Sequence, residues 1–144
     1  MEDEKQLDRN KVVVRRFVEA VNTANYALLD ELLEPGVVRH CQATPDVAVR
    51  SRDDFKRFDQ QSRATFPDQH IAIETLLAEG DRVAVYATFS GTQTGPMGPF
   101  PATGKKVEGK FLSILRLQEG KIAELWVEWD NLALLTQLGH FPPQ

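Results

Sequence analysis

The chain has 144 residues, of which 42% are hydrophobic and 26% charged, a composition typical of one globular domain with its own core. Its formal net charge of −4 argues against nucleic acid or an anionic membrane surface as a partner. It shows no signal peptide and no apolar run that could span a membrane, and the single Cys41 has no partner for an internal disulfide. We therefore expect a cytoplasmic protein with a single domain over residues 1–144.

The first half of the chain is predicted to be mostly helical, because apolar residues recur there every three or four positions. Ser51 followed by Asp54 resembles a capping box, which marks a helix start, while Pro35-Gly36 and Pro67 end helices. The expected elements, in chain order, are a helix over residues 3–23, a helix over 26–33, a short strand over 37–41 and a helix from 51 to about 66.

The second half is predicted to form long strands, because it is rich in β-branched and aromatic residues that alternate between two faces. The turns EGD (79–81) and EGK (119–121) place glycine where φ > 0 is needed, so the flanking strands should pair as hairpins. The expected elements are strands over 69–78, 82–93, 105–118 and 121–130, a loop rich in proline and glycine over 94–105, and a helix over 132–138 ended by Gly139.

Helices first and antiparallel strands afterwards indicate the α+β class rather than a wound parallel sheet. A twisted sheet of four to six strands, curled over three N-terminal helices, would be cone-shaped and would leave a ligand space between the layers. The 94–105 loop is expected to cover that space or to contact another subunit.

Asp130 stands where the last strand ends and the last helix begins, and two roles are open for it. Side chains at 126, 128 and 130 share one strand face, so Trp126 would lie over the carboxyl and burial would raise its pKa toward that of a general acid or base. Alternatively, Asp130 is the N-cap of the helix, where the helix amides would lower the pKa. The two roles predict opposite shifts and can coexist.

The other polar candidates carry weaker signals. His40, His70 and His140 each suit a strand end or the tail, although a histidine can also orient or protonate a carbonyl oxygen. No metal-ligand spacing, nucleophile motif or phosphate-loop spacing is present, so no metal or cofactor is expected. Cys41 is expected to be a small buried residue.

Side chains along the last strand alternate between two faces, and Asp130 does not lie on the more apolar one, which argues against a pocket at Asp130 in a single subunit. Glu128, on the same face as Asp130, is expected to be solvated. The more apolar face lies opposite and is formed by Ala123, Leu125, Val127 and Trp129. A pocket at Asp130 therefore requires both faces to be covered, one of them by another subunit, so we expect a homo-oligomer, a dimer or a tetramer.

Six motifs follow one another along the chain: FPD-x-H (66–70), AEGDRVA (78–84), G-T-x-T-G (91–95), P-A-T-G-K (101–105), GKI-x-E-x-W (120–126) and D-x-x-x-L-x-x-Q-L-G (130–139). In this order and spacing they strongly resemble the SnoaL-like polyketide cyclase family of the nuclear-transport-factor-2-like superfamily. The similarity covers about residues 7–139. It is specific for the family and much less so for a reaction, because one fold hosts many functions.

The resemblance implies a cone-shaped α+β fold and a cofactor-free intramolecular aldol closure of an aromatic polyketide ester in an apolar cavity. Asp130 matches the family's aspartate near the end of the last strand, which acts as general acid and base. His40 and His70 match recurrent family histidines, and Trp126 would form a wall of the cavity. Further substrate-binding candidates are Tyr86 and Phe89.

Two departures from the family pattern bear on the substrate. Gln93 stands where G-T-H-T-G is expected, and the following loop has an extra proline before Phe100. The favoured hypothesis is a cyclase, or a related enzyme, that acts on a small hydrophobic carbonyl compound through Asp130. The alternatives are a non-catalytic binding module for an apolar metabolite, and an epoxide hydrolase-like or ketosteroid isomerase-like enzyme. A hydrolase would need a pocket-facing arginine, and the arginines at or near strands are Arg39, Arg82 and Arg116.

Overall fold

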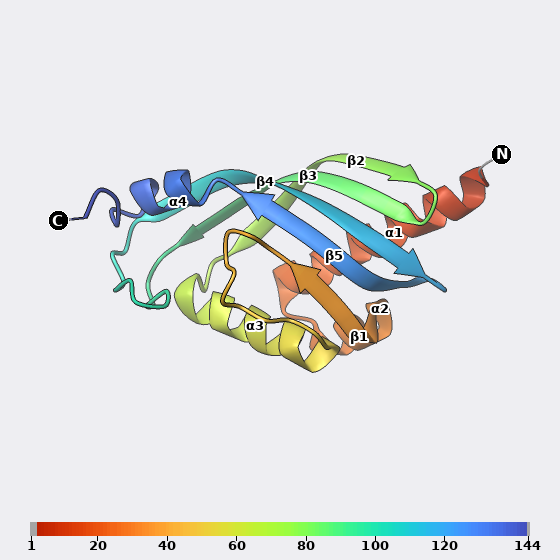
Figure 1. Cartoon of the computed structure of the whole chain (residues 1–144), viewed down its shortest axis with the longest axis horizontal. Helices are drawn as coiled ribbons and strands as arrows, with labels where there is room; N and C mark the ends of the chain where they lie inside the picture. The colour runs from red at the N-terminus through yellow and green to blue at the C-terminus, as the bar shows by residue number, and fades with distance from the viewer. Residues whose placement is uncertain (1–2, 144) are drawn as a thin grey trace.

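The computed structural model describes residues 3–143, and its elements follow the predicted order (Figure 1). The helices are α1 (Glu4–Thr23), α2 (Tyr26–Leu32), α3 (Arg52–Thr65) and α4 (Asn131–Gln137). The strands are β1 (Leu33–His40), β2 (His70–Glu79), β3 (Arg82–Thr92), β4 (Lys106–Gln118) and β5 (Lys121–Trp129). Within residues 3–143, no helix has the length and apolar character needed to cross a membrane.

Side-chain caps explain where the helices begin. Ser51 Oγ accepts a hydrogen bond from the Asp54 amide at 3.0 Å, as the capping-box motif predicts. Asp54 Oδ2 accepts in return from the amide of Arg50, also at 3.0 Å, one residue before the position that the motif implies. The N-caps of α1 and α2 are Asp3 and Asn25.

The strands form one sheet in the order β1-β5-β4-β3-β2, in which consecutive strands from β2 to β5 are antiparallel. The hairpin turns contain Gly80 at φ 57° and the pair Glu119 and Gly120 at φ 52° and 79°, as the turn sequences predict. Strand β1 pairs with β5 in parallel at the edge of the sheet. The predicted α+β fold with a mostly antiparallel sheet is confirmed.

The first strand differs from its prediction. It begins at Leu33, at the end of α2, and therefore contains Pro35 and Gly36, which were expected to separate the two elements. An edge strand tolerates proline, because the missing N–H falls on the unpaired side or at an irregularity. The register with β5 shifts between Leu33 and Val38, which is where the proline lies.

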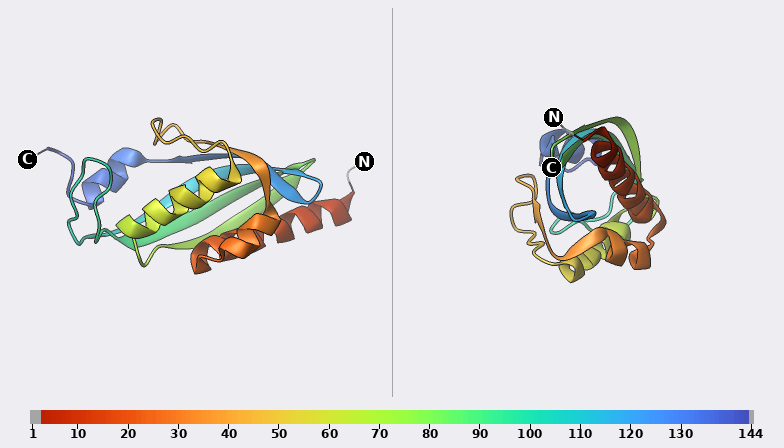
Figure 2. Two further views of the ribbon diagram at one scale, coloured as in Figure 1. Left: turned by 90° about the horizontal axis from the view of Figure 1, so that it is seen from below. Right: turned by 90° about the vertical axis from the view of Figure 1, so that its right-hand side faces the viewer.

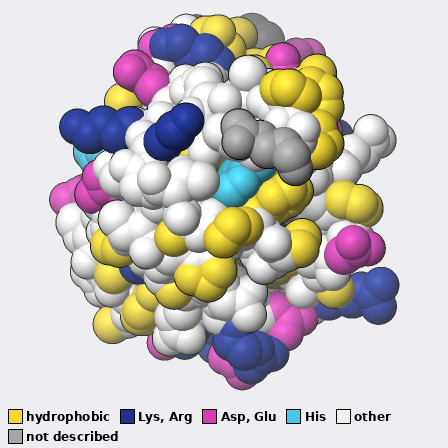
Figure 3. Space-filling view, turned by 90° about the vertical axis from the view of Figure 1, so that its left-hand side faces the viewer, with side chains coloured by type: hydrophobic (Ala, Val, Ile, Leu, Met, Phe, Trp, Pro, Cys, Tyr) yellow, Lys and Arg dark blue, Asp and Glu magenta, His cyan; other side chains and the backbone are white. Residues whose placement is uncertain are grey.

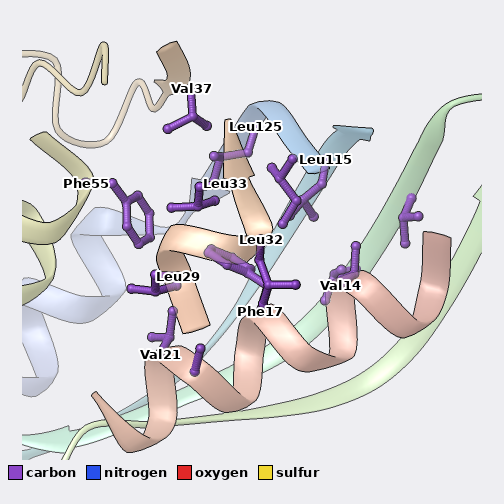
Figure 4. Close-up of a cluster of buried hydrophobic side chains, with 14 of the residues drawn as sticks. Val14, Phe17, Val21, Leu29, Leu32, Leu33, Val37, Phe55, Leu115 and Leu125 are labelled. Carbon is purple, nitrogen blue, oxygen red and sulfur yellow. The ribbon is translucent and has the colours of Figure 1, made fainter. Parts of the chain in front are cut away.

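Helices α1, α2 and α3 cover one face of the sheet, which we call the inner face, and the sheet curls around α1 (Figure 2). The opposite side is the outer face. The core fills the space between the helices and the inner face (Figure 4). Its fully or nearly fully buried side chains include Val14, Leu29, Leu33, Val37, Val83, Ala87 and Ile122.

Candidate functional site

Asp130 caps α4 and is exposed. Its Oδ1 accepts a hydrogen bond from the amide of Ala133 at 3.0 Å, so the predicted capping role is confirmed. Its other carboxyl oxygen has no hydrogen-bond partner among residues 3–143. The cap thus fixes the orientation of the carboxyl group, and within residues 3–143 it leaves one oxygen without a hydrogen bond.

His40 and Trp126 come together on the outer face, where β1 lies beside β5. Their rings stack with centroids 5.3 Å apart and planes 21° apart. His40 Nε2 lies 2.6 Å from Glu124 Oε2, and Arg116 Nε donates to the other oxygen of Glu124 at 3.2 Å. The hydrogen bonds with His40 and then Arg116 hold the pKa of the Glu124 carboxyl below its ordinary value, although desolvation opposes them.

The remaining predicted site residues are dispersed. Tyr86 pairs with Leu112 across β3 and β4 on the outer face, and His70 is exposed on the same face at the start of β2. Phe89 alone points to the inner side, where its ring meets that of Phe66 edge to face at 5.4 Å. Apart from the stacked histidine and tryptophan, the structure does not gather these residues into one site.

Sequence reasoning missed a polar cluster on the inner side, centred on Asp59 of α3. This carboxylate is 3% exposed and accepts hydrogen bonds from Tyr26 Oη at 2.9 Å and Arg63 Nε at 3.0 Å. Gln69 Nε2 adds a longer contact of 3.4 Å. Burial raises the pKa of the Tyr26 phenol, and the hydrogen bond to Asp59 raises it further, so the hydroxyl remains a donor. Helical spacing from Phe55 to Asp59 was the signal that could have revealed this inward carboxylate.

Arg39 is also directed inward, although its neighbour His40 faces out. Its Cζ lies 4.2 Å from the centroid of Phe58 and 5.9 Å from that of Trp129, and the residue is 8% exposed. Burial lowers the pKa of the guanidinium, and the nearby Cys41 and Glu128 partly offset this shift. Arg39 was expected to lie at or near a strand, but alternation by itself did not say which side it faces.

Gln93, at the position where the family motif predicts histidine, has a structural role. It is fully buried, its Nε2 donates to the carbonyl of Pro101 at 3.1 Å, and its Oε1 accepts from His140 Nε2 at 2.8 Å. The amide therefore ties the 94–105 loop to the C-terminal tail. Figure 3 faces this end of the molecule and shows hydrophobic side chains around a histidine, with most charged side chains toward the rim.

The same loop is fastened to the end of α3. The amides of Thr94 and Gly95 both donate to the carbonyl of Thr65, at 3.1 and 3.2 Å, and Thr65 Oγ1 donates to the carbonyl of Pro96 at 2.8 Å. A side chain at Gly95 would place its Cβ 2.1 Å from the carbonyl oxygen of Ala64. The loop is thus anchored at both ends.

The structure also shows how far the side chains of Cys41 and Glu128 are buried. Cys41 is half-buried rather than buried, because it follows the last residue of β1, where the chain leaves the sheet. Glu128 is exposed as expected, and its Oε1 accepts from the amide of Gln42 at 2.8 Å. The described part of the chain contains no group of three His, Cys, Asp or Glu side chains arranged to hold a metal ion.

Two surface concavities are lined by residues other than the predicted site residues. One of about 830 Å³ lies between the start of α1 and the two hairpin turns, lined among others by Arg9, Asp81 and Gly120. Another of about 300 Å³ lies near the end of β3, lined among others by Asp68 and Gln137. None of the predicted site residues lines either concavity, so we take as the candidate site the inner side of the sheet, where Arg39 and Asp59 are buried.

The curled sheet with helices on one face defines an α+β fold of the nuclear-transport-factor-2-like class. The profile of the SnoaL-like polyketide cyclase family matches residues 11–138, and the chain belongs to that family. The aklanonic acid methyl ester cyclase DauD of Streptomyces sp. strain C5 is 28% identical over 134 residues, which cover 88% of this chain and 80% of DauD.

Solved structures agree with this assignment. IdmH from Streptomyces antibioticus superposes with a TM-score of 0.80 at 29% identity, covering 90% of this chain and 98% of IdmH. A SnoaL-like protein from Jannaschia sp. CCS1 has a TM-score of 0.87 and covers 99% of both chains, and at 23% identity it supports the fold alone.

Proposed function

We propose that this protein is a cofactor-free enzyme that closes a ring in a small hydrophobic carbonyl compound by an aldol-type reaction, with Asp130 as general acid and base. The observation that carries the proposal is the state of the Asp130 carboxyl at the end of β5: one oxygen is fixed by the Ala133 amide and the other has no partner among residues 3–143. Similarity to DauD, whose name specifies an ester cyclase, supports the same reaction class.

The chemistry needs few protein groups. Asp130 takes a proton from a carbon flanked by carbonyls, and the resulting enolate carbon attacks a ketone carbon of the same molecule. A carbon–carbon bond forms, the electron pair of the ketone C=O bond moves to oxygen, and the protonated Asp130 delivers its proton there. Holding both reacting carbons together supplies about 7–11 kcal/mol of the barrier, and a positioned acid/base contributes roughly 10²–10⁴-fold in rate.

Asp130→Asn tests the role of the carboxyl directly. Asparagine caps a helix about as well as aspartate, so the stability should not change, while the rate of ring closure on aklanonic acid methyl ester should fall by roughly 10²–10⁴-fold. The matched variant is Asp59→Asn, which changes the buried carboxylate in the same way. Wild-type turnover by Asp130→Asn would falsify the proposal, and loss of turnover in Asp59→Asn alone would transfer the acid/base role to Asp59.

The exposure of Asp130 favours one alternative, a binding module for an apolar metabolite in which this residue only caps α4. Incubation with aklanonic acid methyl ester distinguishes the two functions. A binding module takes up the methyl ester without converting it, and Asp130→Asn then leaves ligand affinity and protein stability unchanged. Conversion of the ester by the wild-type protein decides for the enzyme.

We further propose a homo-oligomer, formed through the outer face and active in the cytoplasm, where the single Cys41 stays reduced. Apolar side chains from β2, β3 and β4 form a band there: Leu77 is 64% exposed, Leu112 61%, Ile114 42% and Tyr86 37%. The register places Leu77 opposite Ala84, which pairs with Ile114, so the band is continuous across the strands. A continuous apolar patch of this kind is typical of a protein–protein interface.

A further inference from the structure

The Arg39 guanidinium is a buried cation without a counter-ion. Among residues 3–143 no carboxylate forms an ion pair with it, and its Nη1 is buried without a hydrogen-bond partner. Cys41 forms a side-chain hydrogen bond with the guanidinium, and Glu128 acts on it electrostatically, but neither is an ion-pair partner. Buried charges in folded proteins are normally paired, because an uncompensated one is costly.

Other arginines of the chain show how unusual this arrangement is. Arg63 pairs with Asp59 at 3.0 Å, and Arg116 pairs with Glu124 at 3.2 Å. Arg82 lies over the Trp126 ring at 5.0 Å in the same manner as Arg39 lies over Phe58, but its side chain is 55% exposed and water can hydrate it. Arg39 combines ring contacts with burial: it is 8% exposed and has no carboxylate partner among residues 3–143.

The rings beside Arg39 leave its donors available. A guanidinium that lies over an aromatic ring contacts the ring with its flat face. Its N–H groups point outward from its edge, so they remain able to bind two oxygens at once. Phe58 of α3 and Trp129 of β5 thus restrict the group without satisfying its hydrogen bonds. Trp129 is the last residue of β5 and directly precedes Asp130 in the chain, so the guanidinium lies near the end of β5.

We propose that Arg39 binds an anionic oxygen, a carboxylate or an enolate, of a planar aromatic ligand on the inner side of the sheet. The enolate case rests on the proposed function, in which removal of a carbon-bound proton creates such an anion, and the guanidinium would stabilise it there. The carboxylate case requires only that the natural ligand is an aromatic acid. In both cases Arg39 recognises the same chemical feature of the ligand, a delocalised oxygen anion next to an apolar ring.

The test compares anionic and neutral probes by calorimetry at neutral pH. The probes are naphthoate against naphthamide, and the anion of hydroxynaphthoquinone, an enolate, against methoxynaphthoquinone. The wild-type protein should bind at least one anion about tenfold more tightly than its neutral counterpart. Preference for the first anion alone identifies a carboxylate ligand, preference for the second alone an enolate, and preference for neither overturns the proposal.

Arg39→Met assigns any preference to this side chain. It keeps the apolar stem and removes the charge, so the anion preference should disappear while affinity for the neutral probes stays within about twofold. Arg82→Met is the matched control, because it removes a ring-stacked arginine from the outer face, and it should keep the wild-type preference. Retention of the preference in Arg39→Met overturns the proposal.

Stability provides an independent readout. Without ligand, Arg39→Met should melt at or above the wild-type temperature, because it removes an uncompensated buried charge. A melting temperature lowered by more than about 4 °C would show instead that Arg39 holds the fold together through its ring contacts, against the proposal. Should Arg39→Met not fold, Arg39→Lys is the second variant. Lysine keeps the positive charge but lacks the paired N–H donors of the guanidinium, so this variant should lose most of the preference for anionic probes.

These outcomes separate the inference from the proposed function. Asp130→Asn should keep the anion preference of the wild type, because binding of the probes needs no proton transfer. If this variant still turns over substrate, the proposed function fails and the carboxylate case is untouched. If Arg39→Met keeps the preference, the inference fails whatever the turnover.

Discussion

The charged side chains on the two sides of the sheet differ in their burial and in their pairing. On the outer face, the carboxylates of Glu74 and Glu124 pair with Lys110, Arg116 and His40 while they remain partly hydrated. On the inner side, Asp59 and Arg39 are each less than a tenth exposed. The ion pairs of the outer face resemble ordinary surface ion pairs, which contribute little to stability. The buried charges of the inner side, in contrast, must be paired by the protein or by a ligand. The proposed ligand site and the proposed subunit interface therefore lie on opposite sides of the sheet, in these two different charge environments.

Removal of the inner carboxylate should have the largest effect. Asp59→Ala leaves Arg63 and the Tyr26 hydroxyl without their acceptor, so the free energy of unfolding should fall by about 3–5 kcal/mol, measured by urea denaturation. The matched outer variant is Glu74→Ala, whose carboxylate contacts Lys110 and Thr88, and its effect should be much smaller. Equal losses in the two variants would contradict the distinction between the two sides.

The anchored loop gives the next largest effect. Gly95→Ala should destabilise the protein by about 1–3 kcal/mol, because the added Cβ overlaps the Ala64 carbonyl and must displace either the loop or the end of α3. The control is Gly36→Ala, where an added Cβ meets no atom within 4 Å. Thermal melts of both variants decide, and a Gly95→Ala protein as stable as the wild type would show that the loop is not held against α3.

Association through the outer face is tested by a charge in the apolar band. Leu112→Glu should convert the oligomer to a monomer in sedimentation equilibrium while the circular dichroism spectrum stays the same, because Leu112 is 61% exposed in the single chain. Val12→Glu on α1 changes a side chain that is 54% exposed outside the band, and it should leave the mass unchanged. A wild-type protein that is monomeric would remove the basis for this assignment.

The smallest effect is a pH dependence at Glu124. Its pKa is lower in the folded protein than the ordinary value of 4.5, so it stabilises the fold above that value, and this contribution is lost as the pH falls through the folded pKa. Between about pH 6 and about pH 3, the wild-type melting temperature should therefore drop more than that of Glu124→Gln. Glu79→Gln, at an exposed site on β2, should follow the wild type. Parallel curves for wild type and Glu124→Gln would contradict the shift.

Most of the fold could be predicted from the sequence, because local signals agree with the tertiary structure. The periods of the apolar residues, the Ser51 cap and the glycine turns place the helices and hairpins within one or two residues. Strand β1 was the exception, since its extent depends on pairing with β5, which is distant in the chain. A proline that breaks a helix locally is tolerated at the edge of a sheet.

The site was harder to predict than the fold. Alternation divides a strand into two sets of side chains, but it does not say which set faces the helices. The family resemblance implied that Trp126 forms a wall of the expected cavity, whereas Trp129 of the opposite set lies beside the buried Arg39 and Trp126 stacks with His40 on the outer face. Family similarity indicated the importance of Asp130 and could not reveal Asp59 or the role of Gln93, because those depend on contacts between α3, the loop and the tail.

The parallel pairing of β1 with β5 has a consequence for the order in which the protein assembles. Strand β1 is made early, yet β5, the strand beside it in the sheet, is made after α3, β2, β3 and β4. Such a distant pairing is entropically slow, so β1 waits with an open edge until nearly the whole domain has left the ribosome. Because Arg39 comes from β1 and Trp129 from β5, the groups of the proposed inner site are among the last parts of the newly synthesised chain to meet.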